Sequence, residues 1–509
     1  MSVKVLSASV IGLDCEVVEV EADNSPFGQP GIYIVGLPDK AVDESKSRVK
    51  SAIKNSGFDF LRGNVIVNLA PADLKKYGTY YDLPIALACL WQAKQIDLLE
   101  FYSNSIFVGE LSLSGDLRAV NGVLSIALMC KEKGINNLFL PKANAREAAL
   151  VKGINIFPVE KLAQLVSHFK NEKNLELFDG FEYDAFEMEE FSIDMASVVG
   201  QEQAKRALEI AAAGSHNILM SGPPGSGKTL LAKALPSILP KISMEESLEV
   251  TRIYSTAGLL TDEEPLINVR PFRSPHHSAS GVALVGGGTW PKPGEISLAH
   301  RGVLFLDEFL EFPKLVLENL RQPLEDGIIN ISRASGTIKF PARFVLVAAM
   351  NPCPCGFFND PDRECVCSPM QVIKYQKRAS GPLMDRIDLH LEVPRVDLDK
   401  LQGHNTGESS VQIRERVQKA RNIQTERFKN EKIICNSEMQ LNEIKKFCRL
   451  ETDGSILLRQ AAEKMRLSAR SYFRILKLAR TIADLEENEN ILIKHIAEAL
   501  QYRSGMEIK

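Results

Sequence analysis

A glycine-rich segment, SGPPGSGKT at 221–229, has the residue types and the spacing of a phosphate-binding loop. It follows a short apolar run and precedes an amphipathic pattern, so the loop is expected to join a strand to a helix. Glycines allow backbone N–H groups to converge on phosphate oxygens, the lysine reaches the β and γ phosphates, and the threonine hydroxyl binds Mg²⁺. The sequence therefore predicts a nucleotide site that comprises Gly222, Pro223, Pro224, Gly225, Ser226, Gly227, Lys228 and Thr229.

Two further apolar runs end in polar residues suited to the same chemistry. The run GVLFLDE, 302–308, ends in paired acids: Asp307 suits the Mg²⁺ shell, and Glu308 is placed to polarise a water for attack on the γ phosphate. The run ARFVLVAAMN ends in Asn351, whose amide suits that water or the γ phosphate, although a plain turn-forming Asn is the alternative. These residues predict hydrolysis of ATP with Mg²⁺.

Four of the nine cysteines lie in one short loop that begins at Asn351. Thiols in a reducing compartment seldom stay paired as disulfides, so the cluster indicates a metal or redox chemistry. Four thiolates from a loop too polar to form its own core suit tetrahedral zinc. Free or redox-active thiols and an iron–sulfur cluster are the alternatives. The predicted zinc ligands are Cys353, Cys355, Cys365 and Cys367.

The composition limits where such a protein works. The chain has 509 residues and is 45% hydrophobic and 25% charged, which is typical of globular domains. No basic start followed by an apolar stretch occurs, nor a membrane-length apolar run, so we expect a cytoplasmic protein without membrane contact. The formal net charge is −4, so any contact with nucleic acid must use a local basic lining.

The elements that position these residues are expected to form two α/β domains and one helical domain. Strand-like runs alternate with helical periodicity over 1–168, which predicts a compact α/β domain. Residues 169–194 are predicted to be a solvated linker, since 171–194 hold nine acidic residues and one lysine. A second α/β domain is predicted for 195–400 and a helical domain for 401–509.

Residues in other local patterns are further candidates for ligand contact. The tandem His276 and His277 suggest a metal site, but without cysteines nearby ordinary polar packing is the stronger interpretation. Residues 326–344 predict a β-hairpin with its turn at 335–336. Arg333 and Lys339 flank that turn and are candidate DNA contacts, with a solvated hairpin tip as the alternative.

Together the motifs resemble the AAA+ ATPase core. The segments GEISLAHRGVLFLDE and RPFRSPHHSASGVALVGGG resemble its magnesium-chelatase-like branch, and nearly the whole chain resembles the YifB/ComM family. The resemblance implies that Arg386, in SGPLMDRID, is an arginine finger that acts on the neighbouring subunit. It also implies that Arg470 is the second sensor arginine, with Arg474 as the competing candidate. A homo-oligomer, a hexameric ring formed on ATP or DNA, is what the family implies.

The N-terminal block resembles the Lon-protease (S5-type) catalytic fold but lacks the Ser–Lys dyad of that fold. Tyr80 lies near the nucleophile position and Leu124 where the lysine would fall, so no peptidase mechanism is expected. The block is expected to be a scaffold or a DNA-facing collar assisted by Lys75 and Lys76, with plain solvated charge as the alternative for the two lysines. The C-terminal block would be the helical AAA+ lid.

Similarity to the YifB/ComM family implies an ATP-dependent DNA motor. It would promote branch migration of branched or single-stranded DNA in homologous recombination, as in integration of DNA during natural transformation. The alternative is an AAA+ remodeller of a protein partner, either a chelatase-type motor or a protease adaptor. Against the chelatase motor, we expect chelatase subunits to resemble only the later part of this chain.

Overall fold

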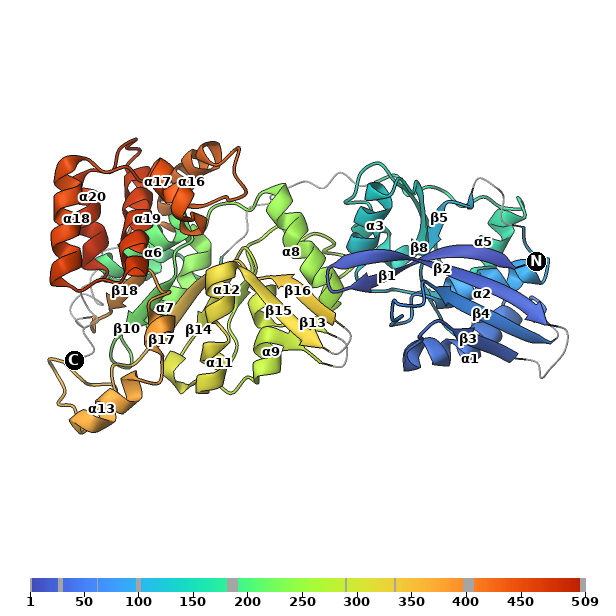
Figure 1. The fold of residues 1–509 in the computed structure, drawn as a ribbon, viewed down its shortest axis with the longest axis horizontal. Helices are drawn as coiled ribbons and strands as arrows, with labels where there is room; N and C mark the ends of the chain where they lie inside the picture. Colours follow the sequence, from blue (N-terminus) through green and yellow to red (C-terminus); the bar gives the residue numbers. More distant parts are fainter. Residues whose placement is uncertain are drawn as a thin grey trace. The chain divides into compact units, whose positions relative to one another are not determined.

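The computed structural model describes residues 2–25, 31–61, 63–97, 102–180, 191–288, 291–333, 336–396 and 407–503. The chain forms two compact units (Figure 1). The first comprises Met1–Ala185 together with Ser247–Ile267 and Ala334–Lys339. The second comprises Phe186–Glu246, Asn268–Arg333 and Phe340–Lys509.

A mixed seven-stranded sheet forms the centre of the first unit, in the order β3-β4-β2-β1-β5-β8-β9. The β1–β2 and β2–β4 pairs are antiparallel, and the other pairs are parallel. Buried Ser7 and Ser9 interrupt the apolar pattern of β1, so the sequence alone does not identify the β1–β2 hairpin. The strands are β1 (Val3–Ile11), β2 (Asp14–Ser25), β3 (Gly31–Val35), β4 (Asn64–Ala70), β5 (Ser105–Phe107), β8 (Asn137–Pro141) and β9 (Asn155–Val159), with the small ribbon β6 (Glu110–Leu111) and β7 (Leu117–Arg118).

Helices cover this sheet with two separate hydrophobic clusters. Val5 of β1 packs in one cluster and Val10 in the other, as expected for strand residues of opposite parity. Burial on both faces makes the unit an α/β layer structure. The first cluster contains α1 (Lys40–Asn55), α2 (Asp82–Gln92) and α5 (Leu162–Phe169); the second contains α3 (Val123–Glu132) and α4 (Ala145–Ala148), which follows η2 (Lys142–Asn144).

The segment Ser247–Ile267 packs in the first unit although it lies between two ATP-site motifs in sequence. It contains most of α8 (Met244–Ala257). The Ser255 hydroxyl donates to buried Glu147, and Arg252 Nε donates to Ser125 Oγ at 3.0 Å. Because these partners are distant in sequence, no local pattern predicts this grouping, which differs from the division of the chain by composition.

Five parallel strands form the sheet of the second unit, in the order β11-β14-β17-β10-β18. The carboxyl ends of parallel strands share one edge, and this places the loops that follow them side by side. The strands are β10 (Ile218–Ser221), β11 (Phe272–Arg273), β14 (Val303–Leu306), β17 (Val345–Met350) and β18 (Leu389–Glu392).

Short helices and ribbons connect these strands. Lys339 lies in the predicted hairpin, whose strands β15 and β16 form a two-stranded sheet, while Ala334 and Ser335 of its turn lie outside the described residues. Two elements, η3 (Met195–Ser197) and α6 (Glu202–Gly214), precede β10. The connecting elements are α7 (Lys228–Ala234), η4 (Leu235–Ile238), α9 (Gly281–Val285), β12 (Gly286–Gly287), β13 (Lys292–Pro293), α10 (Glu295–Leu298), η5 (Phe309–Glu311), α11 (Lys314–Glu318), α12 (Arg321–Asp326), β15 (Ile328–Arg333), β16 (Gly336–Pro341), α13 (Pro369–Gln376) and α14 (Gly381–Met384).

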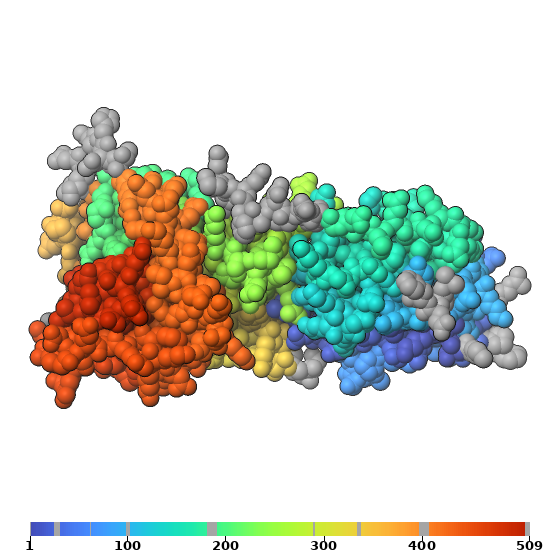
Figure 2. All heavy atoms as spheres, turned by 90° about the horizontal axis from the view of Figure 1, so that it is seen from above, coloured from blue at the N-terminus to red at the C-terminus, as the bar shows by residue number. Residues whose placement is uncertain are grey.

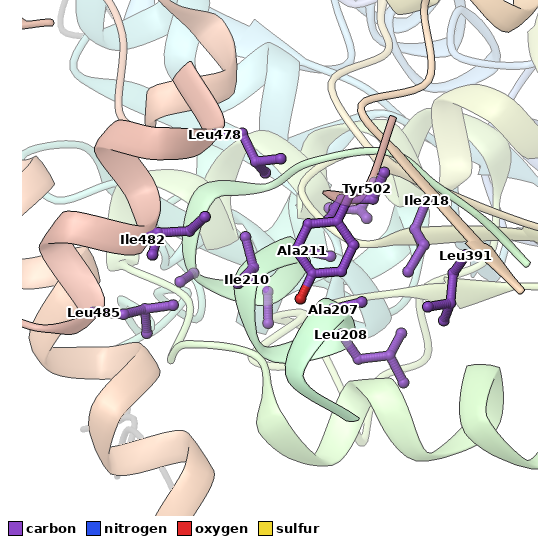
Figure 3. Close-up of a cluster of buried hydrophobic side chains, with 14 of the residues drawn as sticks. Ala207, Leu208, Ile210, Ala211, Ile218, Leu391, Leu478, Ile482, Leu485 and Tyr502 are labelled. Carbon is purple, nitrogen blue, oxygen red and sulfur yellow. The ribbon is translucent and has the colours of Figure 1, made fainter. Parts of the chain in front are cut away.

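The described C-terminal residues from 407 onward are mainly helical and share the core of the second unit. Figure 3 shows Ile210 of α6 on the side of Ile482 of α19, and Leu208 of α6 on the side of Leu391 of β18. Figure 2 shows the C-terminal residues, in orange and red, gathered into one continuous region of surface. The helices are α16 (Ser410–Arg427), η6 (Asn436–Glu438), α17 (Leu441–Phe447), α18 (Thr452–Lys464), α19 (Ala469–Leu485) and α20 (Ile493–Gln501). Among the described residues, no helix is both long and apolar enough to cross a membrane.

Candidate functional site

The phosphate-binding loop joins β10 to α7, as its sequence predicts. Gly225 and Gly227 have φ angles of 77° and 89°, in the left-handed region that favours glycine. A Cβ on Gly222 would lie 2.2 Å from the Val393 carbonyl oxygen, so only glycine fits there. The loop therefore ends at the N-terminus of α7 with the backbone geometry that an anion site requires.

Lys228, the first residue of α7, points back into the loop. Its Nζ donates to the carbonyl oxygens of Gly222 (2.7 Å) and Pro223 (2.8 Å) and lies 3.5 Å from Asn351 Oδ1. Burial lowers the pKa of Lys228 to about 8. The lysine and the asparagine, 123 residues apart in sequence, therefore lie together at the carboxyl edge of the sheet.

Thr229 and Asp307 also meet at this edge. The Thr229 hydroxyl donates to Asp307 Oδ2 at 2.9 Å, and the Glu308 N–H donates to Asp307 Oδ1 at 2.9 Å. The strand register explains the approach, since Leu306 pairs with Ala348 on β17 and Ser221 pairs with Met350. A hydroxyl and a carboxylate at this separation fit the oxygen-rich coordination of Mg²⁺.

Glu308 follows β14 in a left-handed backbone conformation, with φ of 50°. Its carboxylate is about half exposed and lies 3.0 Å from His277 Nδ1. The paired histidines therefore do not act together on one partner, because His276 Nδ1 bonds Ser278 Oγ at 2.8 Å. Among the described residues, the one group of side chains that could hold a metal ion is formed by the four cysteines.

One carboxylate, Glu325 of α12, joins two of the predicted arginines. Arg386 Nη2 and Arg470 Nη2 both donate to it, the latter at 2.9 Å. Among the described residues, no hydrogen bond joins either arginine to the phosphate-binding loop. Sequence reasoning missed Glu325, since nothing local distinguishes it from other acidic helix residues.

Arg474 has a different environment from Arg470. It donates to buried Asp388 and, at 2.7 Å, to the Arg386 carbonyl oxygen. Asp388 also accepts from the Asn217 N–H at 3.0 Å. Burial opposes ionisation, but Arg474 and His216 hold the pKa of Asp388 well below its usual range. Arg474 thus compensates a buried charge.

The four cysteine sulfurs lie together within 4.8 Å of one another. Cys353 Sγ is 3.3 Å from Cys355 Sγ and 3.7 Å from Cys365 Sγ, and the 355–365 separation is 3.6 Å. Sulfurs bound to tetrahedral zinc at about 2.3 Å are about 3.8 Å apart, so the residues fit the metal. Next to the cluster, a Cβ on Gly356 would lie 2.6 Å from Pro224 Cδ, so the cysteine loop packs against the phosphate-binding loop.

The cysteine ionisation pattern also suits a cation. Partial burial opposes ionisation, but the Phe357 N–H and the neighbouring thiols lower the pKa of Cys355 to about 6. The Cys367 N–H favours the Cys365 thiolate, yet burial and the neighbouring thiols raise the pKa of Cys365 to about 12. Full ionisation of the set would therefore need a bound cation, since like charges this close disfavour one another.

The candidate DNA contacts differ in what the structure describes. Lys339 is exposed on β16, whereas the side chain of Arg333 lies outside the described residues. In the first unit Lys75 is exposed, but Lys76 is fully buried and donates to the Pro71 carbonyl oxygen. The expectation that Lys76 is a solvated or DNA-facing charge is therefore wrong. Tyr80 and Leu124, the residues predicted to replace a Lon-type dyad, are half-buried and buried respectively.

Comparison with family models gives three matches along the chain. The magnesium chelatase subunit ChlI model matches residues 194–401, and its C-terminal model matches 407–503. A further model, described as subunit ChlI of Mg-chelatase, matches 18–144. This match overturns the expectation that chelatase subunits resemble only the later part of the chain.

Individual relatives match over nearly the full length. The chain is 45% identical over 507 residues to competence protein ComM of Haemophilus influenzae, covering 98% of this chain and 97% of that one. It is 42% identical over 499 residues to the uncharacterized protein YifB of Escherichia coli, covering 97% of this chain and 96% of YifB. The magnesium-chelatase 38 kDa subunit of Cereibacter sphaeroides is 28% identical over 174 residues, or 31% of this chain and 52% of that subunit.

Proposed function

We propose that this chain, which belongs to the ComM/YifB family of magnesium-chelatase-like AAA+ proteins, is a ring-forming ATPase that drives branch migration of DNA. The name of the Haemophilus relative supports a role in competence, where incoming DNA is integrated by homologous recombination. The protein would act in the cytoplasm.

The single observation that carries the ATPase proposal is the convergence of Lys228, Thr229, Asp307 and Asn351 at one edge of a parallel sheet. The loop N–H groups and Lys228 would bind the phosphates, which replace the loop carbonyls as partners of Nζ. Thr229 and Asp307 would hold Mg²⁺, which would neutralise charge on the β and γ phosphates.

The hydrolytic step needs a base and a positioned water. Glu308 would accept the proton of the attacking water, and the Asn351 amide would orient that water against the γ phosphate. The leaving group is ADP, whose charge Lys228 stabilises. A general base of this kind typically contributes about 10²–10⁴-fold to the rate.

Completion of the site by a second copy is supported by the position of the arginines. Arg386 and Arg470 bond to Glu325 rather than to the loop of their own chain. We assign Arg386 as the arginine finger in trans and Arg470 as the second sensor, so hydrolysis would require a head-to-tail ring, a hexamer by family likeness. Their release from Glu325 would accompany assembly.

The remaining parts are assigned to positioning and DNA contact. A zinc ion held by Cys353, Cys355, Cys365 and Cys367 would fix the loop that packs on Pro224 of the phosphate-binding loop. The β15–β16 hairpin, with Arg333 and Lys339, would present positive charge to a DNA backbone. The first unit, of Lon-like fold without a dyad, would act as a scaffold, and the C-terminal helices as the AAA+ lid.

The second candidate function is remodelling of a protein partner. It is favoured by the chelatase-subunit model that matches 18–144, because this extends the chelatase likeness to the first unit. The two functions differ in the polymer or partner that stimulates ATP turnover.

The test is ATP hydrolysis and strand exchange by the purified chain on labelled three-strand and four-way DNA junctions. Lys228→Ala is the matched control, since it removes the phosphate contact from a loop whose glycines are unchanged. ATP-dependent resolution of the junction by the wild type alone supports the proposal. ATP turnover that no DNA stimulates would instead favour remodelling of a protein partner.

A further inference from the structure

Three arginines stand at the amino edge of the parallel sheet in the second unit. Arg270, Arg301 and Arg343 each precede a strand by two residues, and the strands are β11, β14 and β17. These strands are neighbours in the sheet and run parallel, so the arginines come to one edge. The phosphate-binding loop follows β10 at the opposite, carboxyl edge. Guanidinium groups therefore gather on the side of the sheet away from the proposed ATP site.

A cavity of about 160 Å³ lies at this amino edge, and all three arginines line it. Its other wall comes from the C-terminal helices, with Arg421 of α16, Glu438 of η6 and Arg474 of α19. One water needs about 10–15 Å³ of such space, so the cavity is large enough for a ligand of several heavy atoms.

Arg421 is a charged residue on the buried face of its helix. It belongs to the buried stripe of α16, which also carries Val417 and Ala420. The residue is 7% exposed. Its Nη2 donates to Ser215 Oγ at 2.8 Å and to the Ala212 carbonyl oxygen at 3.3 Å. These two contacts anchor one end of the guanidinium group to the C-terminal turn of α6.

The chain does not satisfy all the donors of Arg421. Among the described residues, Nε is buried without a hydrogen-bond partner, and no carboxylate forms an ion pair with this guanidinium group. Of the described residues that line the cavity, Arg421 is the one with a buried side-chain nitrogen or oxygen left unpaired. A buried donor on a cation costs free energy unless an acceptor meets it. The missing partner is therefore an acceptor, and a negative charge suits it best.

Two of the carboxylates that line the cavity are held by other arginines. The guanidinium group of Arg270 donates to both oxygens of Glu246, at 3.1 and 2.7 Å. Burial lowers the pKa of Arg270; Glu246 opposes this shift, and the nearby charge of Arg421 adds to it. Asp388 is likewise paired with Arg474. Neither carboxylate forms a hydrogen bond with Arg421.

The other acidic residues that line the cavity do not supply the missing acceptor either. Glu438 accepts from Arg301 at 2.9 Å and from Arg343 at 2.8 Å, so one carboxylate serves two guanidinium groups. Glu325 and Asp326 are exposed to solvent. The buried part of the cavity thus has a donor to offer and no carboxylate in contact with it.

We propose that this cavity binds a small oxyanion, with Arg421 as its central donor and the arginines that precede β11, β14 and β17 as surrounding positive charge. The planar guanidinium fork matches the oxygens of phosphate, sulfate and carboxylate groups. The site is separate from the proposed ATP site and does not depend on it. Because its walls come from the sheet and from the C-terminal helices, a bound oxyanion would join these two parts of the second unit.

The test measures binding of inorganic phosphate, sulfate and acetate to the full chain by calorimetry. Mg²⁺ and a non-hydrolysable ATP analogue fill the nucleotide site, and chloride keeps the ionic strength constant. Wild type should bind one of the three at millimolar concentration or below, with one ion per chain. Arg421→Met should lose about ten- to hundredfold in that affinity, because it removes charge-assisted hydrogen bonds. Arg459→Met, which replaces an exposed arginine of α18, should bind the ion as wild type does.

The absence of binding by all three ions would overturn the proposal, as would equal affinities of wild type and Arg421→Met. Thermal melting checks that each variant folds. If Arg421→Met does not fold, Arg343→Gln takes its place, since that side chain is partly exposed. Arg343→Gln should lose about two- to fivefold in affinity, and an unchanged affinity would then overturn the proposal. A wild type that binds no nucleotide would instead count against the proposed ATPase and would leave the comparison of oxyanion affinities intact.

Discussion

Replacement of Arg474 by Met should destabilise the protein strongly, whereas replacement of Arg470 by Ala should not. Asp388 is 4% exposed and receives its main compensating charge from Arg474. Removing one partner of a buried pair costs about 3–5 kcal/mol. Asp388 keeps the Asn217 N–H and His216, 3.4 Å away, so we expect the lower end, about 3 kcal/mol.

The Arg470 pair is different in kind. The side chains of Arg470 and Glu325 are 55% and 45% exposed, so the pair contributes at most about 1 kcal/mol. At about 2–4 °C per kcal/mol, Arg474→Met should lower the apparent Tm by about 6–12 °C and Arg470→Ala by less than about 4 °C. Arg470→Ala should nevertheless lose about 10²-fold in kcat, because it removes a donor to transition-state charge.

Circular dichroism melts and steady-state ATP turnover measure the two quantities. A double variant, Asp388→Asn with Arg474→Met, removes the uncompensated charge and should recover about 2 kcal/mol relative to Arg474→Met alone. Equal Tm losses for both single variants, or full activity in Arg470→Ala, would refute the assignment of Arg474 as structural and Arg470 as sensor.

Three further predictions follow from the site and its surroundings. Purified protein should contain about one zinc per chain, measured by atomic emission. The substitution Cys365→Ser should lower the zinc content and also weaken ATP affinity, because the cysteine loop packs on Pro224. Metal-free protein that binds ATP with full affinity would contradict this. Lys228 has a pKa of about 8, and a bound phosphate favours its charged form, so the affinity for Mg²⁺-free ADP should fall as pH rises above about 8. Calorimetry of wild type and of the control Lys228→Arg measures this affinity. An ADP affinity of wild type that is constant from pH 7 to 9.5 would contradict the prediction. Lys339→Glu should weaken DNA binding at every sequence and reduce its salt dependence. Lys76→Met should leave DNA affinity unchanged, because Lys76 is buried. Fluorescence anisotropy measures both affinities, and the reverse result would exclude the hairpin as a DNA contact.

Local motifs identified residues that the structure brings close together. Glycine spacing and acidic residues at strand ends can be recognised locally in the sequence. Because the strands are parallel, their carboxyl ends lie at one edge of the sheet, and Lys228, Asp307 and Asn351 therefore lie close together there. The cysteine cluster was also predictable, since its four thiols come from 15 consecutive positions.

Contacts between distant segments were not predictable from the sequence. Glu325 meets Arg470 across 145 residues, and His277 meets Glu308 through strand pairing, so neither partner carries a local signal. Lys76 was misjudged because a Lys-Lys pair is typical of a solvated surface, yet the chain turns its ammonium group inward to the Pro71 carbonyl oxygen. Likewise, the buried hydrogen bond from the Ser255 hydroxyl to Glu147 joins residues 247–267 to the rest of the first unit.

The most direct test of the central claim is ATP turnover together with strand exchange on a four-way DNA junction, for wild type and Glu308→Gln. The proposed motor predicts that junction DNA stimulates wild-type turnover, that wild type alone exchanges strands, and that Glu308→Gln binds ATP without hydrolysing it. Turnover that is indifferent to junction, duplex and single-stranded DNA, with no strand exchange, would contradict the account of a DNA motor.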